Sequence, residues 1–235
     1  MFVTPLRFDQ VLERFYCQYE YDLMLLFVSS FDGNDRSILR TIVDNAKRID
    51  RITGDKMCFF YFIKDSYDKM NENLTRWVKN ISNWQPLYGE GVSITMETAD
   101  DICNHFGLLR SNLPAFILIS KNKRITPQVF TIRQYDDLED FLTPLNILHS
   151  YLEDKSAIIS RYYQQRRRSV VPQSDVDRIN EKRKSWNVAI DRLERKKAKE
   201  LLLGMNQKAT ERDRDIEFFK NLLYDNPELT VQGED

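Results

Sequence analysis

The residues of this chain best suited to covalent chemistry are its three cysteines, Cys17, Cys58 and Cys103. They are far apart and odd in number, and no Cys-x-x-Cys pair is present. We therefore expect no disulfide framework, which fits a chain that works in a reducing compartment. Cys58 falls in an apolar run and is predicted to lie in the core, whereas Cys17 lies among aromatic residues and is predicted to be packed or half-buried.

Metal and hydrolytic chemistry find little support in the residue types. The two histidines are His105 and His149, and neither has a second His or Cys at a metal-binding spacing. Cys103 and His105 are two positions apart and would point away from each other on a helix. There is no glycine-rich phosphate loop and no serine- or zinc-hydrolase motif. We expect no metal and no cofactor, and nothing here selects an enzyme.

One cluster of side chains could bind nucleic acid. Arg166, Arg167 and Arg168 follow a pair of tyrosines, and arginines bind phosphate while aromatic rings stack on bases. The cluster opens a basic stretch, residues 161–199, which holds 13 Lys and Arg against five Asp and Glu. A solvated helix face or a patch for an acidic protein explains the same charges. The net charge of −1 gives no overall attraction to nucleic acid.

Length and composition set the class of protein. The chain has 235 residues, of which 42% are hydrophobic, enough for one full core and an extension. The first residues do not resemble a signal peptide. The longest apolar runs are six to seven residues, whereas crossing a bilayer takes about 20. We therefore expect a soluble cytoplasmic protein with no membrane partner.

The elements that must position any site begin with two buried strands. Apolar runs at Leu23–Val28 and Met57–Ile63 are typical of central parallel strands. The spacing of apolar residues predicts a helix between them, from a cap at Asp35 to a stop at Gly54. A further amphipathic helix, to about Tyr19, precedes the first strand.

The second half of this region predicts a hairpin between helices. A short helix ends at Gly107, and Pro114 leads into a strand over Ala115–Ile119. Residues 128–132 can pair with that strand after a turn. A last helix opens near Asp136, and we expect Pro144 to interrupt it or to mark its restart.

This order of elements resembles the thioredoxin fold. Phe106-Gly107-Leu108 and Leu113-Pro114-Ala115 are similar to the family's short helix with its aromatic-glycine end and to its cis-proline before a hairpin. The turn at residues 29–34, where the family carries its redox cysteines, has none, so the chain resembles a redox-inactive member. The interval from Gly107 to Pro114 is two residues longer than usual, and Ala115 replaces a common threonine.

The resemblance implies an α/β fold over residues 1–155, a three-layer sandwich around a central mixed sheet. It also implies a cis peptide bond at Leu113–Pro114 and a platform for an extended partner peptide. Pro114, Leu113 and Phe31 are the candidate partner-binding residues of that platform. Cys103 lies near the functional end of the family, which keeps open a single-cysteine oxidoreductase or redox sensor.

Residues 156–235 are predicted to form a helical extension. Ser174 is the expected helix cap, with Asp177 in the capping-box position. A narrow apolar stripe and the segments that follow it could grip another chain, possible self-association included. The candidate contacts are Trp186, Ile190, Leu193, Leu201 and Phe219. The alternative is a helical hairpin that completes the protein's own core.

Three functions are consistent with these observations. The leading hypothesis is a non-catalytic thioredoxin-like adaptor or scaffold, a subunit of a larger cytoplasmic assembly that binds protein partners. The second is the thiol enzyme or sensor acting through Cys103. The third is a nucleic-acid-binding component acting through residues 161–199.

Overall fold

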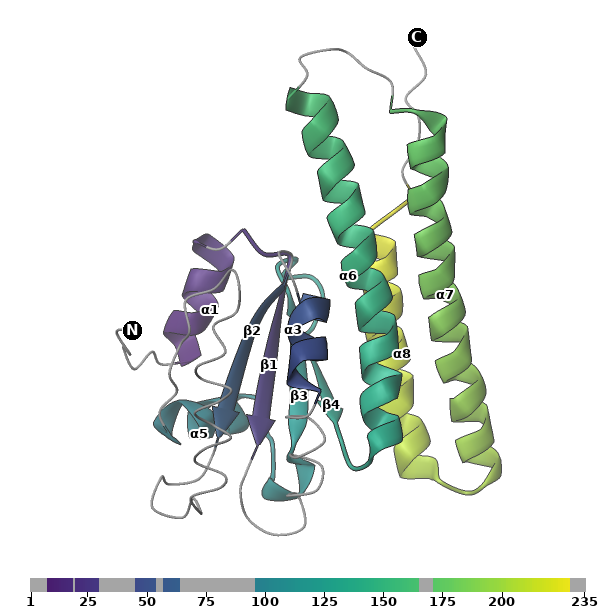
Figure 1. Cartoon of the computed structure of the whole chain (residues 1–235). Helices are drawn as coiled ribbons and strands as arrows, with labels where there is room; N and C mark the ends of the chain where they lie inside the picture. The colour runs from purple at the N-terminus through teal and green to yellow at the C-terminus, as the bar shows by residue number, and fades with distance from the viewer. Residues whose placement is uncertain are drawn as a thin grey trace. The chain divides into compact units, whose positions relative to one another are not determined.

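The fold is known from a computed structural model, which divides the chain into two compact units, Met1–Phe141 and Leu142–Asp235 (Figure 1). The first unit is mixed α/β and the second is helical. The structure describes residues 8–18, 20–29, 45–53, 57–63, 96–164 and 171–228.

The α/β unit is built on a four-stranded mixed sheet with the order β2-β1-β3-β4. β1 (Leu23–Ser29) and β2 (Met57–Ile63) are parallel, whereas β3 (Ala115–Ser120) is antiparallel to both β1 and β4 (Gln128–Thr131). All six residues of β3 are buried. Its uninterrupted apolar sequence therefore matches a central strand that is covered on both faces.

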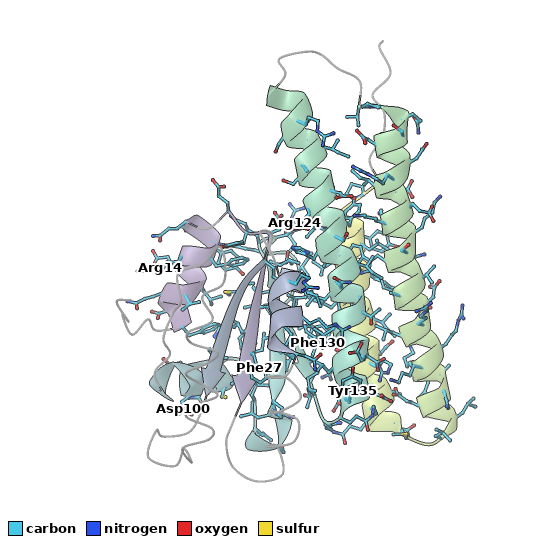
Figure 2. All side chains as sticks on the ribbon, in the orientation of Figure 1. Arg14, Phe27, Asp100, Arg124, Phe130 and Tyr135 are labelled. Atoms are coloured by element: carbon cyan, nitrogen blue, oxygen red, sulfur yellow. The ribbon has the colours of Figure 1, made fainter. Side chains whose placement is uncertain are left out.

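Helices lie on both faces of this sheet. On one face, α1 (Phe8–Cys17) and α5 (Met96–His105) pack against alternate residues of β1 and β3, such as Leu26 and Ile117. α3 (Ala46–Thr53) lies on the opposite side (Figure 1). There the Phe141 ring stacks on Phe116 at 4.9 Å and approaches Phe130, labelled in Figure 2, at 4.6 Å.

Several expectations are confirmed by these elements. The two parallel strands, the short helix before Gly107 and the hairpin after Pro114 are present. The Leu113–Pro114 peptide bond is cis. The helix expected from Asp35 is described from Ala46 onward. Phe31 lies outside the described residues.

Pro144 does not interrupt the last helix of the α/β region, and that expectation was wrong. α6 runs continuously over Tyr135–Gln164. Pro144 removes the N–H that would bond to the Asp140 carbonyl, which by itself disfavours a helix. It lies among buried residues, however, since Leu142, Leu145 and Leu148 are all excluded from solvent. Burial of this apolar stripe outweighs the missing hydrogen bond.

The helical unit consists of α6 from Leu142 onward, α7 (Gln173–Leu202) and α8 (Asn206–Asp225). α7 and α8 form a hairpin (Figure 1). Ser174 is not the cap of α7, contrary to expectation, because Pro172 holds the cap position and the helix begins one residue before Ser174. The Pro172 carbonyl accepts hydrogen bonds from the N–H groups of Asp175 and Val176. The predicted domain boundary after residue 155 falls inside α6.

Candidate interaction surface

The thiols of the described residues differ in accessibility. Cys17 is exposed at the end of α1, whereas Cys103 in α5 is 2% exposed and belongs to the core on one face of the sheet. A reactive cysteine needs an accessible thiolate. Cys103, the thiol on which the redox hypothesis depends, is therefore not accessible, whereas Cys17 is exposed, contrary to expectation.

The loop before β3 turns its predicted contact residues inward. Leu113 and Pro114 are both buried, and the Pro114 carbonyl accepts a hydrogen bond from the Ile132 N–H at 3.0 Å. The Asn112 side chain accepts a hydrogen bond from the Leu109 N–H at 2.9 Å, which shapes the loop. Leu109 is 68% exposed and is the apolar side chain that this loop offers to solvent.

Most of the contact residues predicted in the extension also lie in an interior. Trp186, Ile190, Leu193 and Phe219 are buried in the helical unit. The Trp186 ring lies 6.4 Å from that of Tyr151 on α6. These four side chains complete the unit's own core, as in the alternative that the sequence left open. A partner cannot reach them while the unit is folded in this way.

Leu201 is exposed, unlike these four residues, because it lies at the turn that joins α7 to α8. The turn closes with a Schellman pattern: the Met205 N–H donates to the Glu200 carbonyl at 2.9 Å and the Gly204 N–H to Leu201 at 3.0 Å. Gly204 has a φ of +72°, a left-handed conformation that glycine adopts without strain. α7 therefore ends within a run of leucines.

A buried ion pair fixes the hairpin beside this turn. Arg212 donates two hydrogen bonds to the Glu200 carboxylate, from Nε at 2.8 Å and from Nη2 at 2.9 Å. Both side chains are buried. Farther along the hairpin, Lys220 lies 2.5 Å from Glu194, and this hydrogen bond raises the pKa of the lysine. These pairs hold α7 and α8 in a fixed register.

The result is a group of large apolar side chains on the surface, which we call the apolar turn. It comprises Leu201, Leu202, Leu203 and Met205, which are 50%, 88%, 65% and 43% exposed. Scattered surface leucines are ordinary, whereas a contiguous apolar group often marks an interaction site.

A basic stripe leads along α7 to the apolar turn. Arg192, Arg195 and Lys199 are exposed and are spaced at three and four residues, with Leu202 three residues farther on. This spacing puts all four on one helix face. The nearby carboxylates are engaged elsewhere, Glu194 with Lys220 and Glu200 with Arg212. The structure therefore presents apolar side chains at the turn and cationic side chains beside it on the same helix.

The sequence indicated this surface only in part. Leu201 was a predicted contact, but Leu202, Leu203 and Met205 were not singled out. The signal is the glycine at position 204, which ends the helix and leaves the preceding leucines in a final turn. Arg166, Arg167 and Arg168 lie outside the described residues, so their predicted role stays a prediction.

Within the described residues, no three His, Cys, Asp or Glu side chains gather in a way that could hold a metal ion. None of the helices in the described part of the chain is both long enough and apolar enough to span a bilayer. In comparisons with protein-family models and with curated proteins, the sequence matches none.

Proposed function

We propose that this protein is a non-catalytic adaptor, whose α/β unit has a thioredoxin-like fold and whose helical unit attaches to another cellular component through the apolar turn. One observation carries the proposal. The helical unit completes its own core, yet four large apolar side chains remain exposed on a turn that a buried ion pair holds in place.

The fold part of the proposal is supported by the arrangement of the sheet. The resemblance implies a central mixed sheet with helices on both faces and a hairpin entered from a proline. The strand order β2-β1-β3-β4, with a parallel pair followed by an antiparallel hairpin, agrees with that implication. Free cysteines fit a cytoplasmic setting.

Attachment of the helical unit through the apolar turn is supported by the free energy of burying apolar surface. Covering a leucine side chain with an apolar surface contributes roughly 1.5–3 kcal/mol. Leu202 is 88% exposed, so almost all of that contribution is available to a partner. The buried contact residues of α7 and α8 offer none, because their surface is already covered.

A photo-reactive amino acid at position 202 tests the adaptor proposal in the native cell. We expect covalent adducts on illumination with the probe at Leu202, and none with the same probe at Ser185. Ser185 is the matched control because it is exposed on the same helix, away from the turn. A chain that forms no adduct from position 202 would contradict the proposal.

Nucleic-acid binding remains the second candidate because of one observation, the basic stripe. Arg192, Arg195 and Lys199 could contact successive phosphates. That function gives no role to the apolar turn, which is why the adaptor proposal stands first. It predicts steeply salt-dependent binding of duplex DNA that is lost when these three residues become alanine.

A further inference from the structure

We propose that the surface contacted by the apolar turn is an anionic lipid bilayer. This inference rests on the adaptor proposal and names the partner of the same site. The apolar turn would enter the boundary between headgroups and acyl chains. Lys199 would contact the lipid phosphates, and Arg195 and Arg192 would lie in the electrostatic field of the anionic surface. Both features occur in proteins that lie on membranes without crossing them.

The size of the apolar surface favours a bilayer over a protein. A standard protein interface involves about 20–30 residues on each side. The apolar turn offers four exposed side chains at the end of a hairpin. A second copy of the chain meeting this turn would cover too little surface for a stable dimer. A bilayer accepts a small projecting group because its lipids rearrange around it.

The spacing of the charges along α7 fits the depth of a leaflet. A helix rises 1.5 Å per residue, so Lys199 precedes Leu202 by about 4.5 Å and Arg195 precedes it by about 10 Å. Each headgroup layer is about 5–8 Å thick. With α7 along the membrane normal and Leu202 at the hydrocarbon edge, Lys199 lies among the phosphates. Arg195 then lies just outside the headgroup layer, and Arg192, about 15 Å before Leu202, lies farther into the water.

The sign of the local charge also favours an anionic surface. Two residues between positions 192 and 207 carry carboxylates, and both are paired: Glu194, whose side chain is 41% exposed, with Lys220, and the buried Glu200 with Arg212. On α8, Asp213 pairs with Lys197 at 2.5 Å, and Glu211 is partly buried. Each Lys or Arg near an anionic leaflet strengthens attachment by about fivefold. The expectation of no membrane partner came from the length of the apolar runs, which concerns spanning and not surface contact.

Sedimentation with lipid vesicles tests the inference on the full chain. We expect binding to vesicles of equal parts phosphatidylcholine and phosphatidylserine, and much weaker binding to phosphatidylcholine alone. Leu202→Glu should weaken binding by more than about tenfold. Val188→Glu is the matched control, because Val188 is 49% exposed on the same helix away from the turn. That variant should bind like the unmodified chain.

A second pair of variants tests the basic stripe. Lys199→Gln should weaken binding to the anionic vesicles by about fivefold. Lys184→Gln is the control, because Lys184 is exposed on the same helix farther from the turn. This substitution should leave binding almost unchanged. Circular dichroism of each variant checks that the helices are intact.

These experiments distinguish a failure of the membrane inference from a failure of the adaptor proposal. Absence of binding to the anionic vesicles, or equal binding by the Leu202→Glu variant, overturns the membrane inference. Protein adducts from the probe at position 202, without vesicle binding, would overturn the inference and leave the adaptor proposal standing. Binding of duplex DNA that is insensitive to Leu202→Glu, without vesicle binding, would assign the stripe to nucleic acid. Absence of any adduct from position 202 would contradict the adaptor proposal itself.

Discussion

A carboxylate and a guanidinium meet in the interior of the helical hairpin, twelve residues apart in sequence. Glu200 and Arg212 are both buried and share two hydrogen bonds. Such a pair adds little net stability relative to apolar residues of the same size, because both charges lose their hydration. Its effect is on specificity, since a shift of α8 along α7 would leave two buried charges without partners.

Breaking this pair from one side should strongly destabilise the protein. Glu200→Gln leaves the Arg212 charge buried without its counter-ion, and we expect the free energy of unfolding to fall by about 3–5 kcal/mol. Urea denaturation followed by circular dichroism measures the change. The combined Glu200→Leu and Arg212→Met variant should recover most of the loss. The partly exposed Lys197–Asp213 pair is the control, and Asp213→Asn should cost under about 1 kcal/mol.

A second ion pair predicts a dependence of stability on pH. Arg48 on α3 donates to Glu139 at the start of α6, with Nη2 2.9 Å from the carboxylate. This hydrogen bond lowers the pKa of Glu139, partial burial opposes the shift, and a hydrogen bond with Tyr135 reinforces it. Because the folded pKa lies below the unfolded one, the contribution is present above the unfolded pKa. It is lost as the pH falls through the folded value.

Glu139→Gln tests this dependence. Near neutral pH the unmodified chain should be slightly more stable than the variant, by less than about 1 kcal/mol because the pair is partly exposed to solvent. The difference should close as the pH falls below about 4, the region of an ordinary glutamate pKa. Added salt should reduce it at neutral pH. A difference that widened on acidification would contradict this assignment.

At the scale of elements, the C-terminus of α8 is held by groups from the two other helices of its unit. Arg183 on α7 donates to the carbonyls of Asn226 at 3.0 Å and Leu223 at 3.2 Å. The Tyr151 hydroxyl on α6 donates to the Pro227 carbonyl at 2.9 Å. The last carbonyls of a helix lack partners within the helix, and a cation there also interacts favourably with the helix dipole. These contacts therefore end α8 at a defined place.

Removing the guanidinium should loosen this end selectively. We expect Arg183→Met to lower the free energy of unfolding by about 1–3 kcal/mol, since two carbonyls lose a charged donor. Amide hydrogen exchange should accelerate more in the last turn of α8 than near the apolar turn. Lys184→Met is the comparison, because Lys184 is exposed one residue away. Equal exchange in the two variants would assign the end of α8 to other contacts.

Some expectations from the sequence are confirmed and others are wrong, because the spacing of apolar residues carries only local information. The runs at Leu23–Val28 and Met57–Ile63 predicted β1 and β2 because short, uninterrupted apolar segments have few alternatives. The stripe through Trp186 and Ile190 showed which residues share a helix face. It could not show which chain covers that face, so residues of the unit's own core were assigned to a partner. Likewise, Pro144 looked disruptive because local chemistry does not reveal how deeply its neighbours are buried.

At the scale of the whole molecule, the uneven charge of the extension finds an explanation in the hairpin. The basic stretch is followed by residues 200–235, which hold nine Asp and Glu against four Lys and Arg. α7 and α8 place parts of these two segments side by side, where Lys197 pairs with Asp213 and Lys220 with Glu194. The basic stripe remains exposed near the turn. Internal pairing accounts for part of the basic stretch, because Lys197 pairs with Asp213 and Arg183 with Glu228.

The division at Phe141 predicts that residues 142–235 fold without the α/β unit. Within this fragment lie the contact of Tyr151 with Trp186, the bond of Lys182 to Ser150 at 2.7 Å and the Glu200–Arg212 pair. We expect the fragment of residues 142–235 to be helical by circular dichroism and to unfold cooperatively. A fragment that starts at residue 156 lacks Ser150 and Tyr151, so Trp186 loses part of its cover. It should be less stable by several kcal/mol, as for deletion of a large core side chain. Equal stability of the two fragments would show that α6 adds nothing to this core and that the unit begins after residue 155.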